Sequence, residues 1–374
     1  MELYIFDSNL QFLTIIDCYT QFRWVRRFYS NGEFELSAPL NSLTLEILKE
    51  NNIIVKKDST EAGMINYRQL KLNSNGVEEI NVKGKFIKDI LSRRIVWGTE
   101  NYNNYNTELM LRDLANKNVI DPSNINRKIP SVILGDLNNY TDVISKQISY
   151  KNLLETIEDV TLISNIGTRL DFSVADKKLV FNTYKPLDRT INQNINVPAI
   201  FTKEFDNILE QEFTSSNTNY KNTVFVAGAG QGINRKKITI DSGNKGLHRV
   251  ELFVDARDLQ DTKSVTSGDN TEEVPIPLEE YNKLLLNRGQ EKLKECVDVN
   301  SFTSKINVNQ NNLIYKQDYD LGDIVTCINR KWNIKVNTRI TEVEEFFNTN
   351  GKEINIVFGQ ELPTLIDKIK QLKK

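Results

Sequence analysis

Short runs of alternating apolar and polar residues, separated by turn clusters, dominate the first 97 residues of the chain. This alternation is typical of half-buried β-strands. The expected strands are Leu3–Phe6, Phe12–Cys18, Ile53–Lys57, Met64–Lys71 and Glu79–Lys85. One short helix is expected over Ser42–Lys49, because Asn41 can cap its amino end. Six or so short strands with one helix predict a small closed or half-closed β-barrel over 1–97.

The most distinctive stretch of this region is a predicted hairpin, Gln21–Leu36, with the sequence QFRWVRRFYSNGEFEL. Asn31-Gly32 is a strong turn signal, and a two-residue loop would place Arg27 opposite Leu36. Neither face of this hairpin is purely polar, so we expect both to be covered, one by the barrel core and the other by a partner. The pattern favours a protein that assembles with others.

The pattern changes at Gly98. The polar run ENYNNYN over 100–106 predicts a loop, and Thr107–Asn118 predicts an amphipathic helix. A second helix is expected after a cap at Ser149, followed by a hairpin that ends at Tyr184. We therefore expect 98–200 to form a compact lateral α+β domain.

Strand patterns resume after Ile200 and again after the long helix predicted to end near Cys296. We assign 201–260 and 300–360 to a second β-barrel, 261–299 to a helical insertion and 361–374 to a C-terminal helix. The two β-rich regions share a similar pattern of strands without a sequence repeat. The fold class expected from the residues is α+β, mostly β, in which two related barrels are plausible.

Composition agrees with a folded, soluble chain. Charged residues make up 26% and hydrophobic residues 39%, and 48 basic against 50 acidic side chains leave a net charge of −2. No general attraction to nucleic acid or anionic lipid follows from this balance. The amino terminus lacks the pattern of a signal peptide, and no apolar run approaches the ~20 residues of a membrane helix. The three cysteines are too scattered for a disulfide framework or a zinc module, which favours an intracellular or particle setting.

The motifs that could indicate a catalytic or binding site are weak. Gly228, Gly230 and Gly232 form GxGxG, whereas a dinucleotide site needs GxGxxG at the start of a helix, so a hairpin tip is expected instead. His248 is the single histidine and lies in a run that predicts a strand. We expect no catalytic, cofactor or metal site, and no enzyme.

The acidic and basic clusters of the chain do not indicate a catalytic or metal site either. Asp318-x-Asp320 lacks the rest of a calcium loop, and Glu344-Glu345 lies in a segment expected to face solvent. Arginines beside Trp24 resemble a platform for single-stranded nucleic acid. The nearby Glu33 and Glu35 favour ion pairs, within or between subunits.

Several segments, in order along nearly the whole chain, resemble the siphophage tail-hub proteins, also called tail-associated or baseplate hub proteins. They begin with LYIFDSNLQFLTIIDCYTQFRWVRRFYSNGEFELSAPLN, and the others are VKGKFIKDILSRRIVW, PLDRTINQN, FDNILEQEFTSSNTNYKNTVFVAGAGQG, HRVELFVDARDL and DYDLGDIVTCINRKWNI. The resemblance implies two tube-type β-barrels with lateral α/β insertions, assembled as a homotrimer. Three copies of two barrels would form a pseudo-sixfold ring that joins a sixfold tail tube to a threefold tip.

The resemblance also implies partners and a location. The expected partners are further copies of the chain, the distal tail protein, the tape-measure protein and a tip, fibre or receptor-binding protein, with DNA only in transit. The expected location is the distal end of the virion tail, after assembly in the bacterial cytoplasm. Many relatives carry a C-terminal hydrolase or receptor-binding extension, whereas this chain ends soon after Phe358-Gly359, which favours the structural hub alone.

Ring contacts are expected in the hairpin 21–36, at the glycine-rich tip 228–232 and in the strand that follows Leu321-Gly322-Asp323. The candidate residues are Trp24, Arg26, Arg27, Phe34, Gly228, Gly230, Gly232, Leu321, Gly322 and Asp323. Two other functions stay open at this stage: a cell-wall hydrolase on a β scaffold, and a module that binds a host receptor or carbohydrate.

Overall fold

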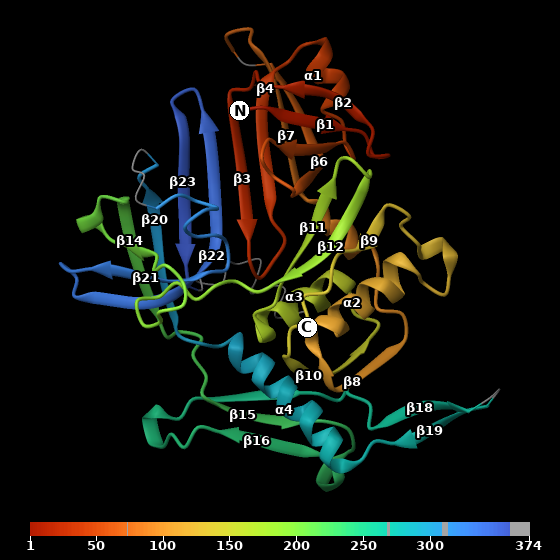
Figure 1. Cartoon of the computed structure of the whole chain (residues 1–374). Coiled ribbons are helices and arrows are strands. Elements are labelled where there is room, and N and C mark those ends of the chain that lie inside the picture. The colour runs from red at the N-terminus through yellow and green to blue at the C-terminus, as the bar shows by residue number, and fades with distance from the viewer. Residues whose placement is uncertain (73, 268–269, 309–312, 360–374) are drawn as a thin grey trace.

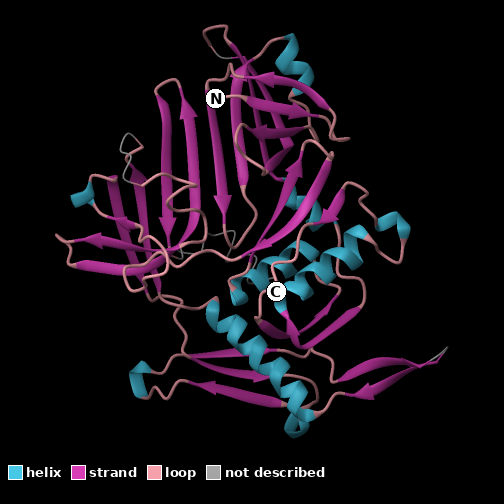
Figure 2. Cartoon of the chain, viewed as in Figure 1, coloured by secondary structure: helices cyan, strands magenta, loops and turns pink. Residues whose placement is uncertain are grey.

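The computed structural model describes residues 1–72, 74–267, 270–308 and 313–359, and strands predominate in it (Figure 2). The predicted mostly-β fold is therefore confirmed. Its central element is a 13-stranded sheet that collects strands from both ends of the chain (Figure 1). The main strand order is β14-β20-β23-β22-β3-β4-β7-β6-β5-β1-β2, with β21 paired to β22 and β13 paired to β21.

The amino-terminal half of the sheet follows the predicted strands closely. Its strands are β1 (Leu3–Phe6), β2 (Phe12–Ile16), β3 (Gln21–Arg27), β4 (Glu33–Pro39), β5 (Ile53–Lys56), β6 (Ala62–Leu72) and β7 (Glu78–Phe86). Helix α1 (Ser42–Ile47) begins at the predicted cap, where Asn41 and Thr44 exchange hydrogen bonds as a capping box. One face of these strands encloses an apolar core around Trp24 and Phe34.

The carboxyl-terminal half is built from segments far apart in the sequence. Its strands are β13 (Ile200–Phe201), β14 (Ile208–Ser216), β20 (Val299–Ile306), β21 (Ile324–Asn329), β22 (Ile334–Asn348) and β23 (Gly351–Phe358). The predicted closing hairpin is confirmed as β22 and β23, which meet at Asn348 and Gly351. The expected helix over 361–374 lies outside the described residues.

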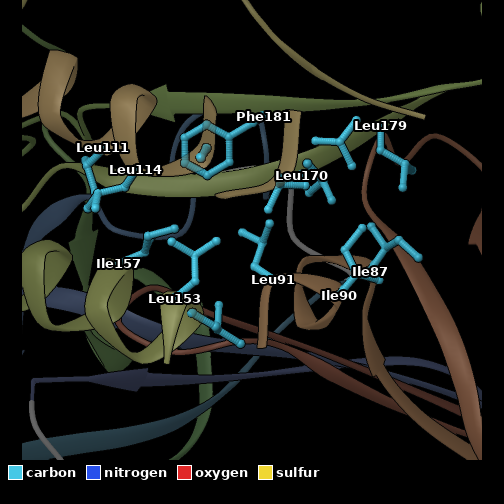
Figure 3. Packing of buried hydrophobic residues seen from close by; sticks show 14 of the residues in the cluster. Ile87, Ile90, Leu91, Leu111, Leu114, Leu153, Ile157, Leu170, Leu179 and Phe181 are labelled. Carbon is cyan, nitrogen blue, oxygen red and sulfur yellow. The ribbon is translucent and has the colours of Figure 1, made fainter. Parts of the chain in front are cut away.

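A lateral domain packs beside the amino-terminal half. Its elements are β8 (Thr99–Asn106), α2 (Thr107–Ala115), β9 (Val132–Leu134), β10 (Val143–Ser149), α3 (Leu153–Ser164), β11 (Gly167–Ser173) and β12 (Lys178–Tyr184). Figure 3 shows its apolar core, where Leu111 and Leu114 of α2 and Ile157 of α3 face Phe181 of β12. The predicted helices and hairpin are present.

Two local expectations in this domain were wrong. The run ENYNNYN belongs to strand β8, because the backbone of β10 pairs with the backbone of β8 between Thr99 and Asn106. The second helix is capped by Asn152, whose side chain accepts from Leu154 and Glu155, while Ser149 ends β10. A polar composition predicted a loop where tertiary pairing made a strand.

A second lateral unit holds three strands of the segment 201–260 that the sequence assigned to a second barrel, whereas β14 of that segment joins the central sheet. Here β15 (Thr223–Ala227), β16 (Lys237–Asp241) and β17 (Glu251–Asp255) form a separate three-stranded sheet. The helix α4 (Leu278–Lys294) covers one face of that sheet through Tyr281 and Leu285, and a ribbon of β18 (Thr262–Ser267) and β19 (Asn270–Pro275) extends beside it (Figure 1). This sheet is separate from the central sheet and has its own apolar core.

The central hairpin is present, but its predicted register was wrong. Trp24 pairs with Phe34, and Arg23 with Glu35, because the loop covers 28–32 rather than two residues. Phe28 leaves the strand to enter the core of the carboxyl-terminal half, where its N–H donates to the carbonyl oxygen of Thr341 (2.9 Å). A long-range contact therefore overrides the local turn signal.

The two halves of the sheet join where β3 pairs with β22, from Arg27 opposite Glu342 to Gln21 opposite Asn348. Beneath this junction the buried carboxylate of Glu345 pairs with the buried ammonium of Lys56 on β5, and Lys352 lies 2.8 Å from its second oxygen. Burial lowers the pKa of Lys56 to about 8, and the pairing with Glu345 opposes that shift. Charges removed from water in this way are stable only while they remain paired.

A second buried ion cluster holds the junction at its other end. Arg26 is 5% exposed and binds Glu61 through Nε, Asp320 through Nη1 (2.6 Å) and the hydroxyl of Tyr315 (2.6 Å). Although burial opposes it, the surrounding acidic groups hold the pKa of Arg26 above its ordinary value. Because these partners come from both halves of the chain, Arg26 fixes the halves relative to each other.

We expect Glu345→Gln to lower the free energy of unfolding by about 3–5 kcal/mol, because it leaves the Lys56 ammonium buried without its anion. Urea unfolding followed by circular dichroism measures the change. The control is Glu353→Gln, which removes an exposed pair with Lys305 and should cost under about 1 kcal/mol. Equal effects of the two substitutions would contradict this account of the junction.

Candidate assembly interface

The central sheet repeats one strand order twice. In the amino-terminal half the order β3-β4-β7-β6 places four successive long strands as first, second, fourth and third. In the carboxyl-terminal half β14-β20-β23-β22 follows the same order, and all neighbours are antiparallel. The two halves therefore share one topology, although their sequences show no repeat.

The junction inside the chain joins the third strand of one unit, β22, to the first strand of the other, β3. The same two kinds of strand lie at the ends of the eight-stranded run, β6 at one end and β14 at the other. On its outer side β6 pairs with β5 only over Ala62–Met64, and β14 pairs only with β20 among the described strands. The eight-stranded run therefore has a third strand, β6, at one edge and a first strand, β14, at the other. The internal junction also joins a third strand to a first strand.

The edges expose apolar side chains on the side of the sheet that is the core elsewhere. Leu70 is 50% exposed and Leu72 66% exposed at the end of β6. At the internal junction the corresponding strand, β22, places Phe347 against Phe22 of β3 with ring centroids 6.1 Å apart. On β14, Phe213 contacts Phe302 of β20, with ring centroids 4.8 Å apart and ring planes tilted by 43°, and is only partly buried.

The opposite face of the eight-stranded run carries charges of both signs on neighbouring strands. Glu342 on β22 lies opposite Arg27 on β3, and Arg23 on β3 lies opposite Glu35 on β4, which lies opposite Lys83 on β7. The ion pairs are Arg23–Glu344, Arg23–Glu33, Arg27–Glu342, Arg27–Glu33, Lys83–Glu35 and Lys305–Glu353. The expected ion pairs of Glu33 and Glu35 are confirmed within one subunit: Glu33 pairs with Arg23 and Arg27, and Glu35 pairs with Lys83.

Arg27 is central to this face. Its Nε lies 2.6 Å from Glu342 and its Nη2 lies 2.9 Å from Glu33. The hydrogen bond from Arg27 is the main reason why the pKa of Glu33 is held below its ordinary value. Cations and carboxylates on the face are thus kept charged and mutually compensated.

The other candidate contact residues of the hairpin lie inside the subunit. Trp24 and Phe34 are buried in the amino-terminal core, and Arg26 is used by the internal ion cluster. Their side chains therefore determine how the junction is held, while Arg27 presents its charge on the polar face. The sequence pattern did not distinguish these roles, because one strand alternates between two faces whose covering is decided elsewhere.

The candidate glycines and the 321–323 turn also have internal roles. The 228–232 segment joins β15 to β16 and forms the tip of a hairpin, as the sequence predicted. It contacts α4, where the backbone N–H of Ala229 donates to the hydroxyl of Tyr281 (2.8 Å). Gly228 packs against Tyr281, while Gly230 and Gly232 have positive φ values. Gly322 has a φ of +93° and lies so close to Phe28 that a Cβ would clash with its ring.

Asp323, the last of these candidates, fixes the segment that leaves the lateral domain. Its carboxylate accepts from the amide of Leu187 (2.7 Å) and pairs with Arg189 (3.0 Å). Leu321 is buried beside it in the carboxyl-terminal core. Within this turn, Gly322 lies directly against Phe28 of the hairpin loop.

The edges of β6 and β14 were not among the sequence candidates. The sequence offered one indication of the β6 edge. Apolar residues continue along this strand as far as Leu72, although Leu70 and Leu72 are not covered by the apolar core. His248 lies in a 3-10 turn before β17 and is exposed, so its predicted place in a strand was wrong. Within the described part of the chain, no three His, Cys, Asp or Glu side chains are grouped as around a metal ion, and no helix is long and apolar enough to cross a membrane.

Three solved tail proteins share this fold across almost their whole length. The tail protein from Neisseria meningitidis MC58 is 12% identical with a TM-score of 0.59, and 96% of each chain is covered. Prophage tail protein gp18 from Listeria monocytogenes EGD-e is 12% identical with a TM-score of 0.57, covering 100% of this chain and 98% of that one. The 43 kDa tail protein of prophage MuSo2 from Shewanella oneidensis is 11% identical with a TM-score of 0.58, covering 96% and 98%.

No curated protein matches the sequence. The model of one family does match, and it covers residues 2–360, which include every described element. The resemblance to siphophage tail proteins is therefore confirmed at the level of family and fold. The chain belongs to the family of siphovirus ReqiPepy6 Gp37-like proteins, with the fold of phage tail proteins.

Proposed function

We propose that the chain is the hub of a phage tail tip and acts as a homotrimeric ring. The observation that carries this proposal is the internal junction, which joins a third strand to a first strand and leaves one of each at the open ends. If β6 of one copy pairs with β14 of the next, the same junction repeats between subunits. Such a head-to-tail contact forms a closed ring when the rotation per subunit closes.

Three copies, each with two four-stranded units, would give six equivalent units around one axis. A ring of this kind matches a sixfold tube on one side and a threefold tip on the other. Closure would also pair the two strand edges, which otherwise invite nonspecific association. Pairing would cover Leu70 and Leu72, which are 50% and 66% exposed in the single chain.

The polar face of the run would line the central channel. Its cations are paired with carboxylates from neighbouring strands, so DNA phosphates passing through would find few free positive charges. The hub would bind the distal tail protein and the tape-measure protein, carry a tip or fibre protein, and close the tube until DNA release. In this role the chain is structural, at the distal end of the virion tail.

The double substitution Leu70→Arg/Leu72→Arg should convert the trimer to a monomer, because it places two cations in the contact between β6 and β14. Light scattering across a concentration series should give a species near three times 43.1 kDa for the natural chain and 43.1 kDa for the variant. Leu13→Arg on β2 is the control, since it also charges an exposed leucine but lies outside the proposed contact. A natural chain that stays monomeric, or a variant that still trimerises, would contradict the proposed ring.

Removing carboxylates from the polar face should create a DNA-binding surface. We expect Glu33→Gln/Glu342→Gln/Glu344→Gln to bind a short DNA duplex at least about tenfold more tightly than the natural chain at low salt, because Arg23 and Arg27 lose their partners. Fluorescence anisotropy at several salt concentrations measures this, and the affinity of the variant should fall more steeply with salt.

The control for this variant is Glu279→Gln, which frees an exposed lysine of α4. It should change DNA binding little, because a single exposed cation offers no extended face. Equal gains in affinity for the two variants would argue against a special role of the polar face.

A further inference from the structure

Trp97 presents an exposed ring beside the guanidinium group of Arg127. It is 61% exposed, whereas Trp24 is buried, and the guanidinium of Arg127 lies 5.0 Å from the centre of its ring. Arg94 is a neighbour of Arg127 and donates from Nε to its carbonyl oxygen (2.8 Å). Neither arginine forms an ion pair with a carboxylate of the described residues, unlike Arg23, Arg26 and Arg27.

A buried asparagine holds the arrangement in place. The Oδ1 of Asn118 accepts from the backbone N–H of Trp97 and from Nη2 of Arg127, each at 3.1 Å, while its Nδ2 donates to the carbonyl oxygen of Leu114 (2.9 Å). Asn118 is 2% exposed and lies in a π-helical turn, Asn116–Ile120, that continues α2. Turns of this kind are rare and occur frequently at functional sites.

The positive charges of Arg94 and Arg127 oppose each other at this surface. Burial lowers the pKa of Arg127, and the nearby charge of Arg94 lowers it further. The two side chains use backbone oxygens as acceptors, namely those of Ile95, Arg127 and Arg93. These contacts fix the guanidinium groups but do not neutralise them, so a carboxylate brought to this place would gain charge-assisted hydrogen bonds.

We propose that the surface defined by Trp97, Arg94 and Arg127, with the exposed Ile125 in the same turn as Arg127, binds an acidic peptide segment of another protein. Carboxylates of the segment would pair with the two arginines, and an apolar side chain between them would pack on Trp97. Ile125 begins the 3-10 turn that ends at Arg127 and is 69% exposed, which offers further apolar contact.

A peptide fits this surface better than a sugar–phosphate chain. A phosphodiester backbone would use the guanidinium groups but would leave Ile125 unused. Tryptophan and arginine are also the residues most enriched at the energetic centres of protein interfaces. The proposal concerns the lateral domain and does not depend on the ring contact between β6 and β14.

The test uses the full-length chain and a fluorescein-labelled peptide, Gly-Glu-Leu-Glu-Leu-Glu-Gly, followed by fluorescence anisotropy. We expect saturable binding that weakens at least about tenfold in Trp97→Ala and in Arg127→Gln. Trp97→Ala keeps the backbone N–H that Asn118 accepts, so the turn should stay folded, and thermal unfolding checks this. A peptide with glutamine in place of glutamate should bind at least about tenfold more weakly to the natural chain, because it lacks carboxylates for the arginines.

The chain supplies a matched control. Trp332 is also exposed and follows Arg330 and Lys331, but no guanidinium or ammonium lies over its ring in the described residues. Trp332→Ala should leave binding unchanged. The proposal is overturned if the Trp97 and Arg127 variants bind the peptide as well as the natural chain. It is also overturned if oligothymidylate binds more tightly than the peptide through the same residues, which would assign the surface to phosphodiester chains.

Discussion

The pairing of β3 with β22 is the contact on which the rest of this structure depends. It joins a strand near the amino terminus to one near residue 345, and it turns two separate four-stranded units into one continuous sheet. Two buried cations on the core side of the sheet stabilise this pairing. Lys56 forms an ion pair with Glu345, and Arg26 forms ion pairs with Glu61 and Asp320. Because an ion is costly to bury alone, these pairs favour one arrangement of the two halves over others.

The continuous sheet explains why its two faces differ so strongly. One face encloses the apolar cores of both halves, while the other carries charged rows that compensate each other across neighbouring strands. A face of that kind needs no covering layer, so it is suited to a water-filled channel. The strand edges are the part of the sheet that a single chain leaves unsatisfied, and natural sheets seldom leave long edges open.

The lateral domains extend the sheet without interrupting it. The chain leaves the amino-terminal half after β7, folds the domain of α2 and α3, and returns at β13, where Asp323 fixes the returning segment. It leaves again after β14 for the unit of β15 to β17 and α4, and returns as β20. The first excursion shares its apolar core with Phe6, Ile53 and Ala62 of the amino-terminal half, and the second has a core of its own, so the sheet repeats its strand order despite long insertions.

Local pattern in the sequence determined most elements of this protein. Alternation predicted nearly every strand of the amino-terminal half and the closing hairpin, and capping chemistry predicted α1, because these signals act between residues close in the chain. The resemblance carried by the hairpin and later segments predicted the family. Tertiary structure alone decided the hairpin register, since Phe28 is drawn into a distant core, and the strand at 99–106, since β10 pairs with it. It also decided which face each residue of β3 presents, because a strand alternates between two sides and only its distant partner, β22, determines which of them is buried.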